Sequence, residues 1–151
     1  ATGKSGRNGG TGAMTTIEFK DYSAESKEEI KSRTLKALTM CGLVIEKAAK
    51  WLATVDTGLL RNSITWALAG YNPAIASYKA DKPKNGVIKT GAYSGAAPND
   101  DELSVFVGTN VEYAPYVELG TAKQKAKPFL KPAAVNSKSE LMQCFQKAFE
   151  N

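Results

Sequence analysis

The chain has 151 residues, enough for one domain with a buried core, and its apolar content is ordinary for a globular protein. No segment approaches the roughly 20 consecutive apolar residues of a membrane helix, and we expect no secretory signal because the N-terminus lacks an apolar run. The net charge of +5 is too mild to indicate nucleic-acid binding by itself. The sequence contains no histidine, which removes the commonest general base and the commonest metal ligand.

Residues 1–13 are rich in glycine and polar side chains and contain too few apolar residues for a core. Such a composition is typical of flexible segments, so we expect a flexible tail or a cloning remnant, with Met14 as a candidate natural start. Residues 14–151 are then expected to form a single domain of the α+β class.

A short strand and a long helix are predicted next. Residues 15–22 alternate apolar and polar side chains, as a strand does. Ser26 and Glu29 have the spacing of a capping box, in which the serine caps the first turn and the glutamate bonds back to it. A helix from there to about Thr54 would gather apolar side chains on one face: Ile30, Ala37, Leu38, Cys41, Val44, Ile45, Ala48, Ala49, Trp51 and Leu52.

Three side chains in the helical patterns need a separate interpretation. Leu43 lies among lysines, so it is either a single exposed leucine or a subunit contact. Cys41 and Cys144 are far apart in the sequence and each fits a helical pattern, so we expect reduced thiols that are buried as small hydrophobic side chains.

The segment 55–64 combines turn and helix signals. Asp56 or Thr57 can supply the oxygen that caps a following short element, and Gly58 permits an unusual backbone conformation. No base accompanies these polar residues, so we interpret the segment as a capped turn and not as a catalytic site. The alternation in residues 63–69 then predicts a strand whose Ile, Trp and Leu side chains share one face.

Residues 71–102 are the least regular part of the sequence, and they predict a strand or hairpin that carries a mobile arm. Asn85-Gly86 is a two-residue hairpin signal. Tyrosines interleave with lysines here, which suits single-stranded nucleic acid but is also usual on edge strands. The candidate interface residues of this arm are Tyr78, Lys79 and Tyr93.

A strand, a short helix and a basic loop follow the arm. Residues 103–108 alternate as a half-buried strand does, and Gly108 opens the turn that ends it. Residues 111–119 have helical spacing, and Gly120 ends this helix because glycine adopts the left-handed cap freely. We interpret the loop with Lys123, Lys125 and Lys127 as a solvated surface or as a contact for an acidic partner or a phosphate.

A C-terminal helix is the last predicted element. Phe129 returns the chain to the core, and the helix begins either near Pro132 or at a second capping box formed by Ser137 and Glu140. Its apolar face would consist of Leu141, Met142, Phe145, Ala148 and Phe149.

Four segments, in this order and spacing, resemble the HK97 gp10-like family of tailed-bacteriophage proteins: VDTGLLRNSI at 55–64, VGT at 107–109, YAPYVELGT at 113–121 and PFLKPA at 128–133. The resemblance covers about Ile17 to Phe149, although residues 70–102 match nothing in the family pattern. It implies an α+β fold in which a long N-terminal helix packs on a small, mostly antiparallel sheet. This agrees with the predicted short helix after the 103–108 strand and the predicted C-terminal helix.

The same resemblance implies a structural virion protein at the head–tail joint, of the kind called tail completion, neck or connector proteins. Such a protein would form a ring homo-oligomer, often a hexamer, and dock on phage connector or tail proteins. It would be assembled in the bacterial host cytoplasm and act in the virion, with incidental contact with phage DNA and no membrane. A ring requires two different patches on each subunit, for which the 71–102 arm and the basic loop are candidates.

In this interpretation the motif residues specify the fold: Asp56, Thr57, Gly58, Arg61, Gly108, Tyr113, Tyr116, Glu118, Gly120 and Phe129. The three glycines would meet backbone requirements, and the two tyrosines would be core or interface aromatics. Arg61 and Glu118 are hypothesised to form an ion pair. The candidate interface residues are Leu43, Tyr78, Lys79, Tyr93, Lys123, Lys125 and Lys127.

Two other classes of function were compared with this one. A small nucleic-acid binding module that uses the basic loops is the alternative, and its affinity would fall with salt. An enzyme would have to work without histidine, with buried cysteines and without a paired-carboxylate motif. The acidic residues at 100–102 are a weak candidate for a metal site. We therefore expect no enzyme, no cofactor and no metal.

Overall fold

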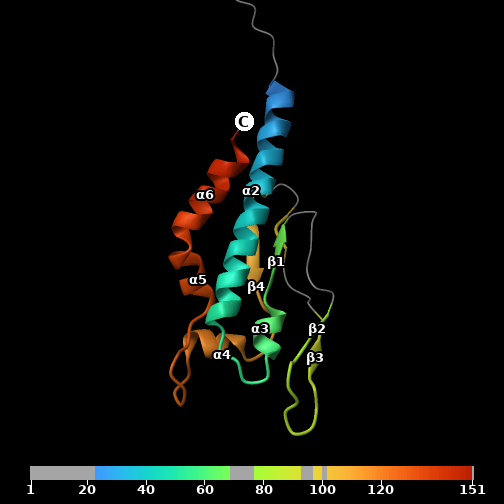
Figure 1. Ribbon diagram of the computed structural model, residues 1–151, viewed down its shortest axis with the longest axis vertical. Helices are drawn as coiled ribbons and strands as arrows, with labels where there is room; N and C mark the ends of the chain where they lie inside the picture. Colours follow the sequence, from blue (N-terminus) through green and yellow to red (C-terminus); the bar gives the residue numbers. More distant parts are fainter. Residues whose placement is uncertain (1–22, 69–76, 93–96, 100–101, 151) are drawn as a thin grey trace, which may run out of the picture. The chain divides into compact units, whose positions relative to one another are not determined.

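The computed structural model describes residues 23–68, 77–92, 97–99 and 102–150 (Figure 1). The chain divides into two compact units, Ala1–Ile30 and Lys31–Asn151. The described residues of the first unit are the first turns of helix α2 (Ser23–Leu52). The predicted tail and the predicted strand at 15–22 lie outside the described residues, and the single domain from residue 14 stays a prediction.

Helix α2 begins before its predicted cap. Ser26 already lies inside the helix, so it cannot be the N-cap residue, whose backbone is not helical. The capping box predicted at Ser26 and Glu29 was therefore wrong. Glu25 lies in the first turn, where a negative charge interacts favourably with the helix dipole. The helix ends at Leu52, slightly before the predicted Thr54.

Two strands that are distant in sequence form the main sheet of the second unit. Strand β1 (Thr65–Leu68) pairs antiparallel with β4 (Val105–Gly108), so that Thr65 lies opposite Gly108 and Leu68 opposite Val105. A long helix and a small antiparallel sheet confirm the predicted α+β class.

Helix α2 packs directly on this sheet. A Cβ atom at Gly42 would lie 3.0 Å from Val105 Cγ2 and 3.1 Å from the Trp66 ring, so a glycine here lets helix and sheet approach closely. Leu38 joins Trp66 and Leu68 in a buried cluster at the same contact. This contact fixes the position of α2 over the two strands.

Strand β1, predicted from the alternation in residues 63–69, is buried on both faces. All four of its residues are buried, including Thr65 and Ala67. The side chains of Thr65 and Ala67 are short and uncharged, so burying this second face of the strand costs little free energy. In β4 the burial of the side chains alternates only weakly: Phe106 is exposed, whereas Val105 and Val107 are half-buried.

The predicted hairpin is confirmed. Strands β2 (Tyr78–Lys79) and β3 (Thr90–Gly91) pair antiparallel, and a bridge joins Lys84 to Val87 across the turn. Asn85 and Gly86 both have positive φ, 54° and 79°, which is the backbone geometry that a tight hairpin turn requires.

Four short helices complete the described part of the second unit: α3 (Leu59–Ser63), α4 (Ala114–Leu119), α5 (Leu130–Asn136) and α6 (Lys138–Ala148). The predicted C-terminal helix is thus two helices that meet at Ser137. Ser137 occupies the N-cap position of α6, but its side chain makes no capping hydrogen bond, so the capping box with Glu140 is not formed. Ser137 is itself buried, packed at the junction.

Helices α2 and α6 lie close together at the two cysteines, which do not form a disulfide. Both thiols are free and buried, as predicted, and Cys41 Sγ lies 3.8 Å from the Leu141 carbonyl oxygen. Burial, together with the neighbouring Cys144 thiol, raises the pKa of Cys41 to about 11. Just after the end of α6, the Phe149 carbonyl oxygen accepts a hydrogen bond from Arg33 Nη1 at 3.2 Å.

Two predicted apolar faces were too wide. Trp51 is 87% exposed, because it lies two residues, or about 200° of helix rotation, from the buried Ala49. On α6 only the small side chains Cys144 and Ala148 are buried, whereas Met142, Phe145 and Phe149 are exposed. Helices α2 and α6 thus bury mainly small side chains, and large apolar side chains remain at the surface.

Candidate functional site

The segments 55–64, 113–121 and 128–133, which carry the family resemblance, meet in one buried cluster. Leu59 and Leu60 of α3, Val117 of α4, and Phe129 and Ala133 at α5 pack together. Phe129 is fully buried, as predicted. Segments that lie tens of residues apart are therefore held as one body around a common core.

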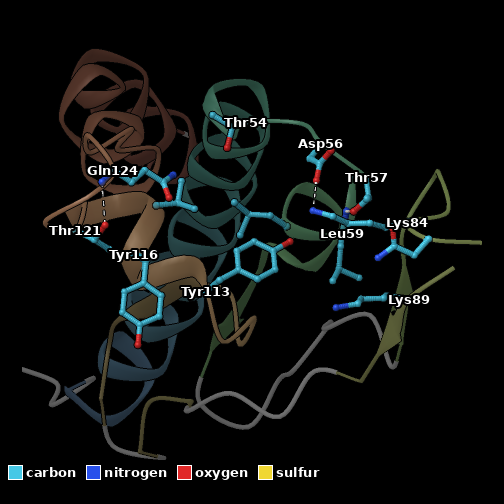
Figure 2. Close-up of a pocket in the computed structure, with 14 residues that line it drawn as sticks. Thr54, Asp56, Thr57, Leu59, Lys84, Lys89, Tyr113, Tyr116, Thr121 and Gln124 are labelled. Atoms are coloured by element: carbon cyan, nitrogen blue, oxygen red, sulfur yellow. Dashed lines mark hydrogen bonds and ion pairs between the residues drawn. The ribbon is translucent and has the colours of Figure 1, made fainter. Parts of the chain in front are cut away.

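A cavity of about 690 Å³ opens beside this cluster (Figure 2). The loop before α3, the β2–β3 hairpin, helix α4 and the loop after it each contribute to its wall. The lining residues are Thr54, Asp56, Thr57, Gly58, Leu59, Leu60, Lys84, Asn85, Lys89, Tyr113, Tyr116, Val117, Thr121 and Gln124. Polar and cationic groups thus surround an apolar floor.

The backbone at Thr57 anchors the hairpin to one side of the cavity. The Thr57 carbonyl oxygen accepts hydrogen bonds from the backbone N–H groups of Asp81 (2.7 Å) and Lys82 (3.1 Å). The Thr57 hydroxyl lies 3.4 Å from the Leu59 N–H at the start of α3, a long and weak capping contact. Of the two residues that the sequence offered for this cap, Thr57 makes the contact, and Asp56 pairs with Lys84 instead.

Gly58 has the conformation that the sequence predicted for it. Its φ is 85°, in the left-handed region, and it occupies the N-cap position of α3. A Cβ atom at this position would lie 2.8 Å from Asp81 Cγ. Both the backbone conformation and the close approach of the hairpin therefore require glycine.

Arg61 does not pair with Glu118, so the predicted ion pair was wrong. Arg61 forms an ion pair with Asp81 instead. Asn62 Nδ2 donates to Asp81 Oδ1 at 2.9 Å and to the Lys79 carbonyl oxygen at 2.8 Å. The hydrogen bond from Asn62, together with the Arg61 charge, lowers the pKa of Asp81. No local pattern in the sequence marks Asp81, because its role depends on where the hairpin docks.

Glu118 has a different and well-defined set of partners. Its Oε2 accepts the backbone N–H groups of Phe129 (2.7 Å) and Leu130 (3.0 Å), and its Oε1 accepts that of Lys131 (2.9 Å). Burial by itself would raise the pKa of Glu118, but the three N–H donors outweigh it, so the pKa is lowered. One carboxylate from α4 therefore satisfies the N–H groups at the start of α5, which no side chain of α5 caps.

Charged and aromatic groups line the open side of the cavity. Lys84 Nζ lies 2.9 Å from Asp56 Oδ2, and this contact raises the pKa of Lys84. Burial, with a further contribution from the Asp56 charge, raises the pKa of Tyr113. In Figure 2 the Tyr113 hydroxyl is directed into the cavity, whereas Tyr116 points away from it. Tyr116 is 59% exposed and is therefore not a core residue.

Tyr78, whose interface role stays a prediction, has local partners in the structure, and the predicted role of Gly108 changes. The Tyr78 hydroxyl donates to Asn110 Oδ1 at 2.7 Å, and Asn110 Nδ2 donates to the Ala92 carbonyl oxygen at 2.8 Å, so this half-buried tyrosine holds the arm to the strand end. Gly108 has no positive φ, and a Cβ atom there would meet nothing within 4 Å. The position therefore does not require glycine, in contrast to the prediction.

The remaining predicted residues occupy the surface or the ends of helices. Gly120 ends α4 with φ 78° and ψ 172°. Lys79, Lys123, Lys125 and Lys127 are exposed. Tyr93 lies outside the described residues. Leu43 is 51% exposed and lines a second hollow, of about 980 Å³, together with Trp51 of α2 and Pro132 of α5.

A family model described as "Bacteriophage HK97-gp10, putative tail-component" matches residues 17–120 of this chain. The match includes the segment before α3, the sheet and α4. The chain belongs to the HK97 gp10-like family. The 128–133 segment lies beyond the match, so its part in the resemblance rests on the sequence alone. No curated protein and no solved structure matches the chain.

Membership identifies this HK97 gp10-like protein as a bacteriophage tail component with a structural role in the virion. Among the described residues, no helix combines the length and the apolar character needed to cross a bilayer. Within the same residues, no three His, Cys, Asp or Glu side chains gather as a metal site would require.

Proposed function

We propose that this tail component acts at the head–tail joint of a tailed bacteriophage or prophage, as a tail completion or connector protein. It assembles into a ring of identical subunits and docks on neighbouring connector or tail proteins. Its task is binding, without catalysis. The protein is assembled in the host cytoplasm and stays in the virion at the head–tail interface.

Large apolar side chains left at the surface of the second unit carry this proposal. Trp51 is 87% exposed, Leu119 79% and Val135 62%. Single exposed apolar residues are ordinary, but Trp51 and Leu43 lie together in the second hollow, between α2 and α5. Exposed apolar surface with a polar rim is typical of protein–protein interfaces.

The arrangement of exposed groups also suits a ring. A closed ring of identical subunits needs two different patches on each subunit, one of which binds the other patch on the next copy. The second unit exposes apolar residues on α2 and α4 and lysines on the hairpin and the 121–127 loop. These surfaces lie on different elements, so each subunit offers more than one patch for contact with its neighbours.

Light scattering across a concentration series, followed by electron microscopy of the same samples, tests the proposal. We expect a discrete oligomer whose images are closed rings of one diameter. A chain that stays monomeric at every concentration, and that also fails to bind to isolated tails, would refute the proposed role. A salt-dependent mobility shift with DNA in the absence of rings would instead favour the nucleic-acid module.

A further inference from the structure

We propose that the cavity beside α3 and α4 is the receiving half of the contact between subunits, and that it binds the acidic first turns of α2 from a second copy of this chain. The inference rests on the proposed ring and names the two surfaces that would form it. Three observations support it: the basic rim of the cavity, the acidic composition of the helix start, and the apolar residues beside each.

The rim of the cavity is basic. Lys84 and Lys89 of the hairpin segment line it, and Figure 2 shows both side chains at its edge. Asp56 also lines the cavity and pairs with Lys84, so the unbalanced positive charge comes from Lys89 and from the loop after α4. Thr121 and Gln124 also line it, and between and after them the loop carries Lys123 and other exposed lysines. Residues 121–127 contain three lysines and no acid. A cationic rim around an apolar floor favours a partner that is both acidic and apolar.

Hydrogen bonds hold the basic loop in a defined shape. The Thr121 N–H donates to the Gln124 carbonyl oxygen at 2.8 Å, and the Thr121 hydroxyl accepts from the Gln124 N–H at 3.0 Å. The Lys127 N–H donates to the Val117 carbonyl oxygen at 2.8 Å, which fastens the loop to α4. The lysine side chains are thus presented from a fixed backbone, which lowers the entropic cost of binding.

The described start of α2 has the complementary composition. Residues 23–30 contain three glutamates and one lysine, and residues 24–30 are exposed. Glu25, Glu28 and Glu29 stand at spacings of three and four, so their carboxylates share one side of the helix. A surface with this excess of negative charge is complementary to a cationic one, which favours their approach in one orientation.

Apolar side chains accompany the charges on both surfaces. Val87 and Ile88, near the hairpin turn, are 61% and 51% exposed, and Ile30 beside the glutamates is 55% exposed. An interface commonly combines an apolar centre with a charged rim. Because one chain carries both halves, each copy can bind the next, and repetition of this contact yields a ring if the rotation closes.

Paired charge reversals in the full chain test this assignment. E25K/E28K reverses the helix surface and K89E/K125E reverses the cavity rim, while Lys84 is kept because it pairs with Asp56. We expect each variant alone to weaken self-association on the order of tenfold in light scattering, because repulsion replaces attraction at the contact. K138E/K147E, which reverses two exposed lysines of α6, is the matched control and should associate as the native chain does.

Mixing the two reversed variants provides the decisive measurement. In the mixture, the cationic helix start of E25K/E28K can bind the acidic rim of K89E/K125E. A one-to-one mixture should therefore recover the oligomer that neither variant forms alone. Circular dichroism and melting curves establish that both variants fold. Association of the native chain should also weaken as salt rises from about 0.05 M to 0.5 M, since screening shortens the range of these charges.

Several results would overturn the assignment. Native rings that tolerate both reversals refute it and leave the proposed function standing. Loss of association in both variants without recovery in the mixture also refutes it. A K89E/K125E variant that associates normally but no longer slows duplex DNA in a gel would also refute it, because the rim would then bind phosphate. A native chain that neither forms rings nor binds to tails refutes this inference and the proposed function together.

Discussion

Removing the Glu118 carboxylate should loosen the junction between α4 and α5. The carboxylate accepts three backbone N–H groups at the start of α5, two of them part-buried and the Lys131 N–H exposed. Hydrogen bonds to a charged acceptor contribute about 1.5–3 kcal/mol each, and water can replace the exposed one. Glu118→Ala should therefore cost about 3 kcal/mol.

The conservative variant separates charge from geometry. Glu118→Gln keeps one acceptor oxygen, which can serve the Phe129 and Leu130 N–H groups, but it loses the negative charge at the helix start. We expect a loss of about 1–2 kcal/mol, between the native chain and the alanine variant. Glu112→Ala, at an exposed acidic residue just before α4, is the control and should change stability by less than about 0.5 kcal/mol.

Urea and thermal unfolding followed by circular dichroism measure these differences. For a chain of this size, 3 kcal/mol corresponds to a fall in Tm of roughly 10 °C. The pKa of Glu118 is lowered in the folded state, so its stabilisation is complete above its ordinary pKa and is lost as pH falls through the folded pKa. The gap between native and Glu118→Gln should thus narrow below about pH 4.5. An alanine variant as stable as the control would refute this reasoning.

Three further predictions follow from single contacts. Gly58→Ala should lower the free energy of unfolding in urea by about 2–4 kcal/mol, because it adds left-handed backbone strain and a clash with the hairpin. Gly86→Ala, where nothing lies within 4 Å, should lower it by only about 1 kcal/mol. Equal losses would show that the hairpin moves to relieve the clash. Trp51→Ser should leave the melting curve nearly unchanged but weaken oligomer formation in light scattering, and unchanged association would remove Trp51 from the interface. Cys41 should react with a thiol reagent at pH 8 only on unfolding, since at a pKa of about 11 roughly one thiol in a thousand is ionised; fast labelling of the native chain would contradict its burial.

Local signals in the sequence were sufficient wherever one residue or one short stretch dictates its own backbone. Asn85-Gly86 predicted the hairpin turn because few other residue pairs adopt two successive positive φ angles. Gly58 and Gly120 marked positions of positive φ for the same reason. Periodicity located α2 and β4, and apolar segments with turn signals placed Phe129 in the core.

Tertiary structure alone decided the partners of the charged groups and the depth of burial. Arg61 and Glu118 are opposite charges in adjacent segments, yet each found another partner: Asp81 on the docked hairpin and the amide groups at the start of α5. Trp51 belongs to an apolar helix but faces outward, because α2 makes its contacts through Gly42 and Ala49. Periodicity gives the directions in which side chains point, whereas ion pairs and burial depend on which distant segment occupies the space beside them, and that is a property of the packed chain.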